Sequence, residues 1–104
     1  MNRVTFAAKP VSEDVERIFD FTSLLQEGET LASAVVSASV FSGTDTTPEN
    51  LLDGDPEVDG VRVEQKITGG ELGTVYTLLC QAGTCNGQVH SLAAYLALQE
   101  AADD

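Results

Sequence analysis

Basic side chains are the scarcest charged groups in this sequence. Its 104 residues contain 5 Lys and Arg against 17 Asp and Glu, which gives a formal net charge of -12 at pH 7. Neutralising nucleic-acid phosphates or anionic lipid headgroups requires clustered lysine and arginine side chains. The composition therefore argues against direct binding to DNA, RNA or an anionic membrane surface, and it indicates partners that are basic or neutral.

Long apolar runs are also missing. Polar or charged residues interrupt every hydrophobic stretch well before the roughly 20 residues that a membrane-spanning helix needs. The first ten residues lack the apolar core and small-residue cleavage site of a secretion signal, so synthesis is expected to end in the cytoplasm. The hydrophobic share of 42% and the charged share of 21% are those of an ordinary folded domain rather than of a disordered acidic chain.

Histidine and cysteine are too few for a conventional metal or nucleophile site. The sequence has one histidine, His90, and two cysteines, Cys80 and Cys85. Zinc-site spacing is absent, and a nucleophile made of Cys85 and His90 would lack a third group to orient it. Five residues of extended chain would separate the two cysteine Cα atoms by roughly 16 Å, too far for a disulfide. We expect Cys80 to be buried and Cys85 to flank a turn, where it could cross-link to another subunit.

What the sequence does contain is hydrophobic alternation of period two, which is typical of β-strands. Strands are expected over residues 13–21, 31–42, 61–67, 74–82 and 88–98, with a short helical turn over 22–29. Small side chains on both faces of 31–42 suit a strand that is packed closely by its neighbours. Residues 43–60 are rich in Thr, Asp, Pro and Gly, which predicts a long loop pinned by Leu51 and Leu52.

Asn86-Gly87 is the strongest local turn signal, because a two-residue type I′ hairpin needs positive φ at both central positions. This turn would pair Cys80 with Ala93. Good helix formers fill residues 92–102, so propensity alone favours a helix there. We interpret this segment as the second strand of the hairpin, because packing commonly overrides propensity.

Carboxylates are concentrated in the expected loop. The candidates for an interaction loop are Asp45, Glu49, Asp53, Asp55 and Asp59. Asp53, Asp55, Glu57 and Asp59 occur at every second position, and Glu64 follows where an EF-hand loop has its last ligand, so calcium is an alternative. Against calcium, Val58 replaces the turn glycine and Pro56 stiffens the segment. A solvated acidic loop is the favoured interpretation, and no metal or other cofactor is expected.

Short signatures in both halves of the chain resemble a known family. The first half contains Lys9-Pro10, Phe19-Asp20-Phe21-Thr22-Ser23-Leu24-Leu25 and Gly28-Glu29-Thr30-Leu31-Ala32-Ser33-Ala34. The second contains Gly69-Gly70, Gly73-Thr74-Val75-Tyr76-Thr77-Leu78 and Asn86-Gly87. Over residues 9–99 this succession resembles the fibre-tail adaptor proteins of tailed bacteriophages. It departs from them at Phe21, where the family often has Trp, and in residues 43–60, which are longer and more acidic.

The resemblance implies an all-β, immunoglobulin-like sandwich of about seven strands with one short helical turn. Residues 9–104 would form this single domain, with residues 1–8 as an N-terminal arm or edge strand. It further implies a non-enzymatic virion protein that contacts other virion proteins, forms a homo-oligomer in the particle, and is assembled in the bacterial host cytoplasm. No contact with nucleic acid or membrane is expected.

Two alternatives to the adaptor are a head-decoration subunit and a calcium-dependent binding module, and an enzyme ranks last. The acidic residues would form an electronegative rim on the sandwich. Such a rim would either meet a basic docking surface or keep a lumen from adhering to DNA.

Overall fold

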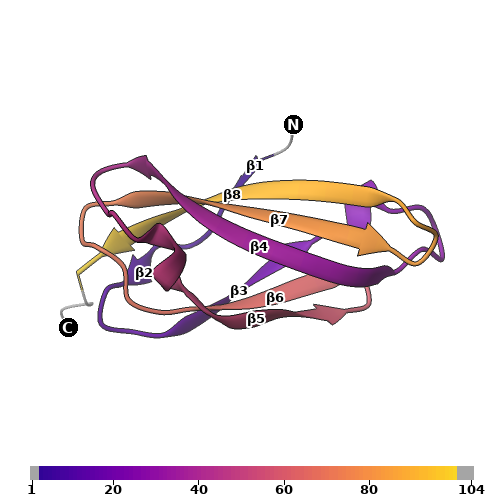
Figure 1. The fold of residues 1–104 in the computed structure, drawn as a ribbon, viewed down its shortest axis with the longest axis horizontal. Coiled ribbons are helices and arrows are strands. Elements are labelled where there is room, and N and C mark those ends of the chain that lie inside the picture. The colour runs from indigo at the N-terminus through magenta and orange to yellow at the C-terminus, as the bar shows by residue number, and fades with distance from the viewer. Residues whose placement is uncertain (1–2, 101–104) are drawn as a thin grey trace.

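The chain forms two β-sheets that pack face to face in a computed structural model, which describes residues 3–100 (Figure 1). The strands are β1 Arg3–Thr5, β2 Lys9–Pro10, β3 Val15–Asp20, β4 Leu31–Ser42, β5 Leu52–Asp59, β6 Arg62–Ile67, β7 Val75–Thr84 and β8 Val89–Gln99. Two short 3-10 helices are η1 Thr22–Leu24 and η2 Pro48–Leu51. The large sheet has the order β1-β8-β7-β4 with β2 beside β8, and the small sheet has the order β3-β6-β5.

This strand order is that of an immunoglobulin-like sandwich. The small sheet corresponds to strands B, E and D of a constant-type domain, and β4, β7 and β8 correspond to C, F and G. The first strand is divided into β1 and β2, both of which run parallel to β8. The predicted all-β sandwich is confirmed, and η1 lies within the predicted helical turn. No helix within residues 3–100 is long and apolar enough to cross a membrane.

The core lies between the sheets and is lined by alternate residues of the long strands. Its buried side chains include Phe19, Val63 and Ile67 from the small sheet, and Tyr76, Leu78, Cys80, Leu92, Ala94 and Leu96 from the large one. Cys80 and Cys85 are both free thiols, the first buried and the second exposed. Burial raises the pKa of the Cys80 thiol to about 12.

The hairpin between β7 and β8 differs by one residue from the sequence prediction. Cys80 pairs with Leu92 instead of Ala93. Of the two turn residues, only Gly87 has a positive φ, 88°, and its N–H donates to the carbonyl oxygen of Thr84 at 3.1 Å. This is the geometry of a three-residue connection with a left-handed glycine at its end, not of a two-residue type I′ turn.

Core burial explains the observed register. Cross-strand partners share a face, so pairing Cys80 with Leu92 aligns the even-numbered, inward-facing residues of both strands. A slip of one residue would turn the leucines of β8 toward the outer face. The predicted strand at 88–98, by contrast, is confirmed as β8, as are the strands near 13–21, 61–67 and 74–82.

One further expectation is wrong. The expected loop 43–60 contains η2 and β5, and β5 pairs with β6 along its length apart from a register shift between Asp53 and Glu57. The predicted strand at 31–42 is confirmed as β4, whose outer face is open, with Val35 65% and Phe41 59% exposed.

At the N-terminus, β1 pairs with β8 of the same chain. The division into residues 1–8 and 9–104 stays a prediction. Residues 1, 2 and 101–104 of these predicted parts lie outside the described residues.

Candidate functional site: an acidic face on the small sheet

Charged side chains are gathered on the outer face of the small sheet, in three rows that cross its strands. The rows are Glu16, Lys66 and Asp53; Ile18, Glu64 and Glu57; and Asp20, Arg62 and Asp59. In the first and third rows a basic residue lies between two acidic ones. The middle row has two carboxylates directly opposite each other and no basic side chain, and its third member, Ile18, is 45% exposed.

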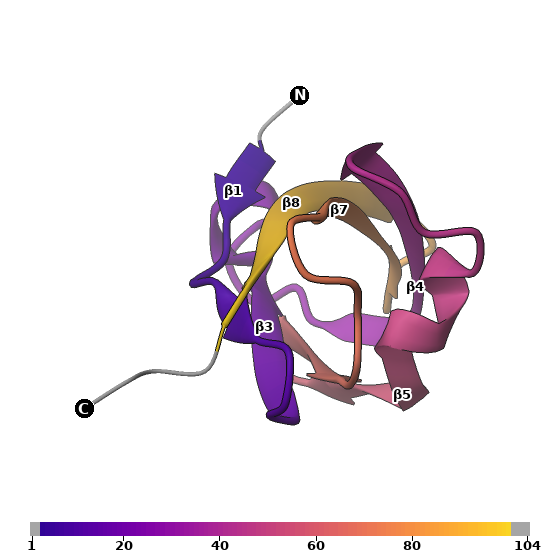
Figure 2. The same ribbon diagram turned by 90° about the vertical axis from the view of Figure 1, so that its left-hand side faces the viewer.

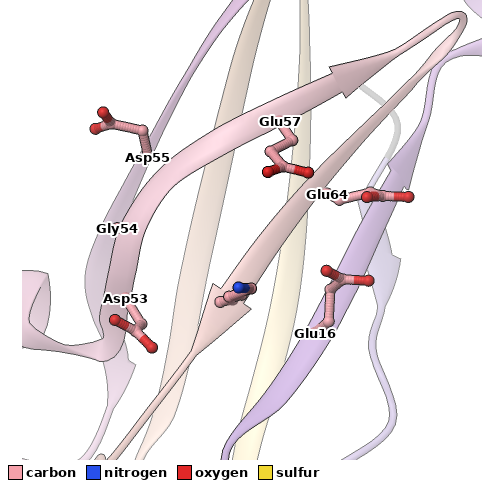
Figure 3. A pocket seen from close by; sticks show the side chains of 7 residues that line it. Glu16, Asp53, Gly54, Asp55, Glu57 and Glu64 are labelled. Carbon is pink, nitrogen blue, oxygen red and sulfur yellow. The ribbon is translucent and has the colours of Figure 1, made fainter.

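A shallow depression of about 260 Å³ lies on this face (Figure 3). It is lined by Glu16, Asp53, Gly54, Asp55, Glu57, Glu64 and Lys66, which are five acidic residues and one lysine besides a glycine. Figure 3 shows Glu16, Glu57 and Glu64 close together on three neighbouring strands, with Asp55 directed away at the edge of β5. The strands thus combine carboxylates that are distant in the sequence.

The cations of this face neutralise it only weakly. Arg62 Nε lies 3.9 Å from Asp20 Oδ2, and both side chains are more than half exposed, so the pair contributes little to stability. The pKa of Asp20 is lowered chiefly by hydrogen bonds from the hydroxyl and the backbone N–H of Thr22, not by Arg62. Most of the negative potential of the face therefore remains available to a partner.

Replacing Glu64 with lysine should stabilise the protein by about 0.5 to 1 kcal/mol. The change converts the like-charge pair with Glu57 into an opposite-charge pair across β5 and β6. Glu64→Gln, which removes the repulsion without adding an attraction, should give about half the gain. Urea unfolding at low and high salt measures both, and the gain should shrink at high salt. A loss of stability in Glu64→Lys would show that the pair does not repel.

The β5 carboxylates do not have EF-hand geometry. Asp53 and Asp59 lie at opposite ends of an extended strand, about 20 Å apart at the usual rise per residue, whereas calcium ligands converge within about 2.6 Å of one ion. Among residues 3–100, no group of three or more His, Cys, Asp or Glu side chains could hold a metal ion.

The predicted interaction residues are divided between three places. Asp53 and Asp55 line the depression, and Asp59 ends the third row. Glu49 is exposed in η2. Asp45 is bound within the fold, where it accepts hydrogen bonds from the Tyr76 hydroxyl at 2.6 Å and from the backbone N–H of Thr47 at 2.9 Å.

Tyr76 was not identified from the sequence as more than a strand residue, yet it organises the turn before β7. Its hydroxyl donates to Asp45 and accepts from the backbone N–H of Glu71 at 2.9 Å. Burial, together with the bond to Asp45, raises the pKa of Tyr76 to about 12, and the same bond lowers the pKa of Asp45. A tyrosine near the start of strand F that bonds back to an upstream backbone group is a feature of immunoglobulin-like folds.

The large sheet is the electrostatic opposite of the small one. β4, β7 and β8 contain no Asp, Glu, Lys or Arg at all. The outer face of this sheet presents serines, threonines and apolar side chains, and the rings of Phe41 and Tyr95 lie 4.6 Å apart on it. The charge on the strands of the sandwich is therefore confined to the small sheet and the short first strand.

The comparison with protein families agrees with this architecture. A family model described as Podophage GP4 fiber-tail adaptor protein gp77 matches residues 9–97, which is most of the chain. The chain belongs to the Gp77 fibre-tail adaptor family. None of the curated proteins matches it. The resemblance drawn from Lys9-Pro10, the Phe19–Leu25 segment and the glycine turns is confirmed.

Membership of the Gp77 family identifies a bacteriophage structural protein of the tail. An adaptor of the virion implies contacts with other virion proteins. Most of the matched residues form the sandwich itself, from β2 almost to the end of β8, so the match includes strands of both sheets.

Proposed function

We propose that this Gp77-family chain is a non-enzymatic adaptor subunit that docks basic surfaces of other virion proteins on the acidic face of its small sheet. The observation that carries the proposal is the depression, whose lining has five acidic residues and one lysine. The family match favours an adaptor over a head-decoration subunit, and the geometry of β5 offers little to a calcium-dependent binding module.

The middle row explains why a basic partner fits this face. Glu57 and Glu64 repel each other, and a lysine or arginine from a partner would relieve that repulsion while its aliphatic stem packs on Ile18. Long side chains of this kind are favoured where charge and apolar surface adjoin. The attraction would be strongest at low ionic strength, because exposed charges are screened over about 10 Å at 0.1 M salt.

The remaining features of the proposal follow from the same charge distribution. A chain of net charge -12 repels nucleic acid and anionic lipid, so the contacts are with proteins. Its uncharged large sheet would allow copies to approach one another in a homo-oligomer within the particle. Assembly in the host cytoplasm is consistent with free thiols at Cys80 and Cys85.

The docking role can be tested by neutralising the depression. In the variant Asp53→Asn, Glu57→Gln, Glu64→Gln, affinity for the virion proteins encoded beside this gene should fall roughly tenfold at low salt, and the salt dependence of binding should weaken. A matched control, Glu27→Gln, Glu71→Gln, Glu100→Gln, removes the same charge from exposed positions outside the depression. Equal losses in both variants, or no binding to any virion protein, would overturn the proposal.

A further inference from the structure

We propose that the free edge of β4 accepts an extended segment of a partner protein as an additional strand, and that an arginine or lysine of this segment enters the groove between β4 and β5. The inference deepens the proposed function and rests on it for the existence of a protein partner. It concerns the adjoining side of the sandwich, on which β4 and β5 lie together (Figure 2). Gly54 and Asp55 line both this side and the depression.

β4 is the longest sheet edge in the described residues, and its register shifts lie near its two ends, between Leu31 and Ser33 and between Val40 and Ser42, which leaves residues 33–40 as a regular edge. Its 12 residues contain no charge and no proline, and its only ladder is with β7. Natural edge strands are usually short, charged, bulged or interrupted by proline, since unpaired backbone groups recruit other strands.

The other three edges show these protections. β1 has three residues. β5 carries four carboxylates, Pro56 and a register shift after Asp53. Beside β3, the guanidinium of Arg17 donates to the carbonyl oxygen of Ala7 at 3.0 Å, so a chain segment already lies there. The regular central part of β4, which has no charge and no proline, therefore indicates an edge that is used.

A groove of about 460 Å³ runs beside this edge. Residues 34–36 of β4 form one wall, and the bulged part of β5, including Gly54, Asp55 and Pro56, forms the other. Gln65 of β6 also lines it. A strand added to β4 would direct alternate side chains toward this groove, because successive side chains of a strand point to opposite faces.

Gln65 indicates what kind of side chain the groove takes. It is 1% exposed, and its Nε2 donates to the carbonyl oxygens of Lys66 at 2.8 Å and Gly54 at 3.2 Å. Both partners are acceptors, so the amide nitrogen must face them, and Oε1 is left as a buried acceptor without a partner. Most buried acceptors are satisfied, so this one calls for a donor.

Asp55 adds a negative charge to the same groove. The two acceptors together suit a cationic side chain with several N–H donors, of which arginine is the best match because its guanidinium carries five. The occupant is thus an extended segment with uncharged flanks and one basic side chain.

A second copy of this chain fits the edge less well. If two β4 strands paired, the β5 edges of both copies would approach as well, because β4 and β5 lie on the same side (Figure 2). Asp53 and Asp55 of the two copies would then repel. Addition of a foreign strand has no such cost. Variable-type immunoglobulin domains also extend the equivalent sheet beyond strand C, although with strands of their own chain.

The test uses a capped peptide of about ten residues, a usual strand length, with alternating Thr and Val and one central Arg. It should bind and slow amide hydrogen exchange along residues 33–37, and the same peptide with a central Glu should bind at least tenfold more weakly. Asp55→Asn should weaken the Arg peptide about fivefold or more. Asp59→Asn, the same charge change on the same strand outside the groove, should change it less than twofold.

Four outcomes would overturn the inference: equal affinity of the two peptides, equal effects of the two variants, protection confined to the β1 side, or protection of β4 by self-association without peptide. The last would assign the edge to a second copy. Virion-protein binding that survives Asp55→Asn unchanged but is lost on neutralising the depression would leave the proposed function standing without strand addition at β4.

Discussion

Replacing Lys9 with methionine should lower the free energy of unfolding by about 3 kcal/mol, a large part of the stability of a domain of this size. Lys9 lies in β2 and is 0% exposed. Its ammonium donates to the carbonyl oxygens of Pro10 and Gly69 at 2.9 Å and of Val11 at 3.3 Å. The bond to Gly69 ties the N-terminal segment to the turn that follows β6.

Two opposing effects decide the size of this loss. Burial lowers the pKa of Lys9, and Asp14 and Glu13 act in the opposite direction. Keeping the ammonium charged at this site therefore costs free energy of desolvation. Methionine removes that cost and keeps most of the apolar stem. It removes three hydrogen bonds from a charged donor, however, each worth about 1.5 to 3 kcal/mol. The carbonyl oxygen of Pro10 still accepts from the N–H of Glu13 at 3.1 Å, whereas those of Val11 and Gly69 lose the ammonium. The loss of these hydrogen bonds should therefore outweigh the removal of the desolvation cost.

Urea unfolding of Lys9→Met beside Lys66→Met measures the effect. Lys66 undergoes the same chemical change at an exposed position between Glu16 and Asp53, where the loss should be at most about 1 kcal/mol. If Lys9→Met were as stable as the original protein, the desolvation of the ammonium would have to cancel all three hydrogen bonds. The Lys9-Pro10 signature would then need another explanation.

The strands that the sequence predicts correctly are those in which apolar and polar residues alternate, because this alternation buries one face of the strand in the core. Phe19 in β3, Val63 in β6 and Leu78 in β7 face the core because each lies on the apolar side of an alternating segment. β5 escaped prediction because its carboxylates, Gly54 and Pro56 resemble a loop. Those residues are tolerated in an edge strand, where they also discourage further pairing.

Contacts between distant residues could not be predicted from local patterns. Lys9 and Gly69 are 60 residues apart, and Tyr76 and Asp45 are 31 apart. The predicted register of the last hairpin was wrong for a related reason. Turn propensity is a local property, whereas the position of Leu92 is determined by packing in the core. The acidic segment was recognised, but the row that combines Glu57 with Glu64 exists only through strand pairing.

Strand pairing determines on which sheet the charged side chains lie. Composition alone gives an acidic molecule, and the sequence suggests an acidic rim in one loop. In the fold, the carboxylates of β5 join those of β3 and β6 on one sheet, while β4, β7 and β8 carry none. An adaptor with one charged and one uncharged face can distinguish partners by chemistry, the charged face through electrostatic complementarity and the uncharged one through strand and apolar contacts.

Replacing Tyr76 with phenylalanine should cost about 2 kcal/mol at pH 7, and this cost should disappear as the pH rises toward 12. The hydroxyl of Tyr76 is buried and bonded to both Asp45 and the backbone of Glu71. Its pKa is raised from 10.0 to about 12 in the folded protein, first by burial and then by the bond to Asp45. The folded state therefore keeps a proton that the unfolded state releases near pH 10.

The direction of this pH dependence follows from the number of protons that each state binds. Between pH 10 and about 12 the unfolded chain binds fewer protons at this residue than the folded one, so the free energy of unfolding falls as pH rises, by up to about 3 kcal/mol. Cys80 acts in the same direction and Lys9 in the opposite one, but both are present in the variant too. Their contributions cancel when the stability of Tyr76→Phe is subtracted from that of the original protein at each pH.

Urea unfolding from pH 7 to 12 gives this difference directly, and a double-mutant cycle with Asp45→Asn assigns its origin. Asp45→Asn should cost less in the Tyr76→Phe background than alone, because the hydrogen bond between the two residues is already absent. At acid pH the dependence should be the opposite. The bond lowers the pKa of Asp45, so the stabilisation by the Asp45 carboxylate is present above about pH 4 and is lost as pH falls through the lowered pKa. A stability difference that stayed constant up to pH 12, with additive effects in the cycle, would show that the Tyr76 hydroxyl acts by packing alone.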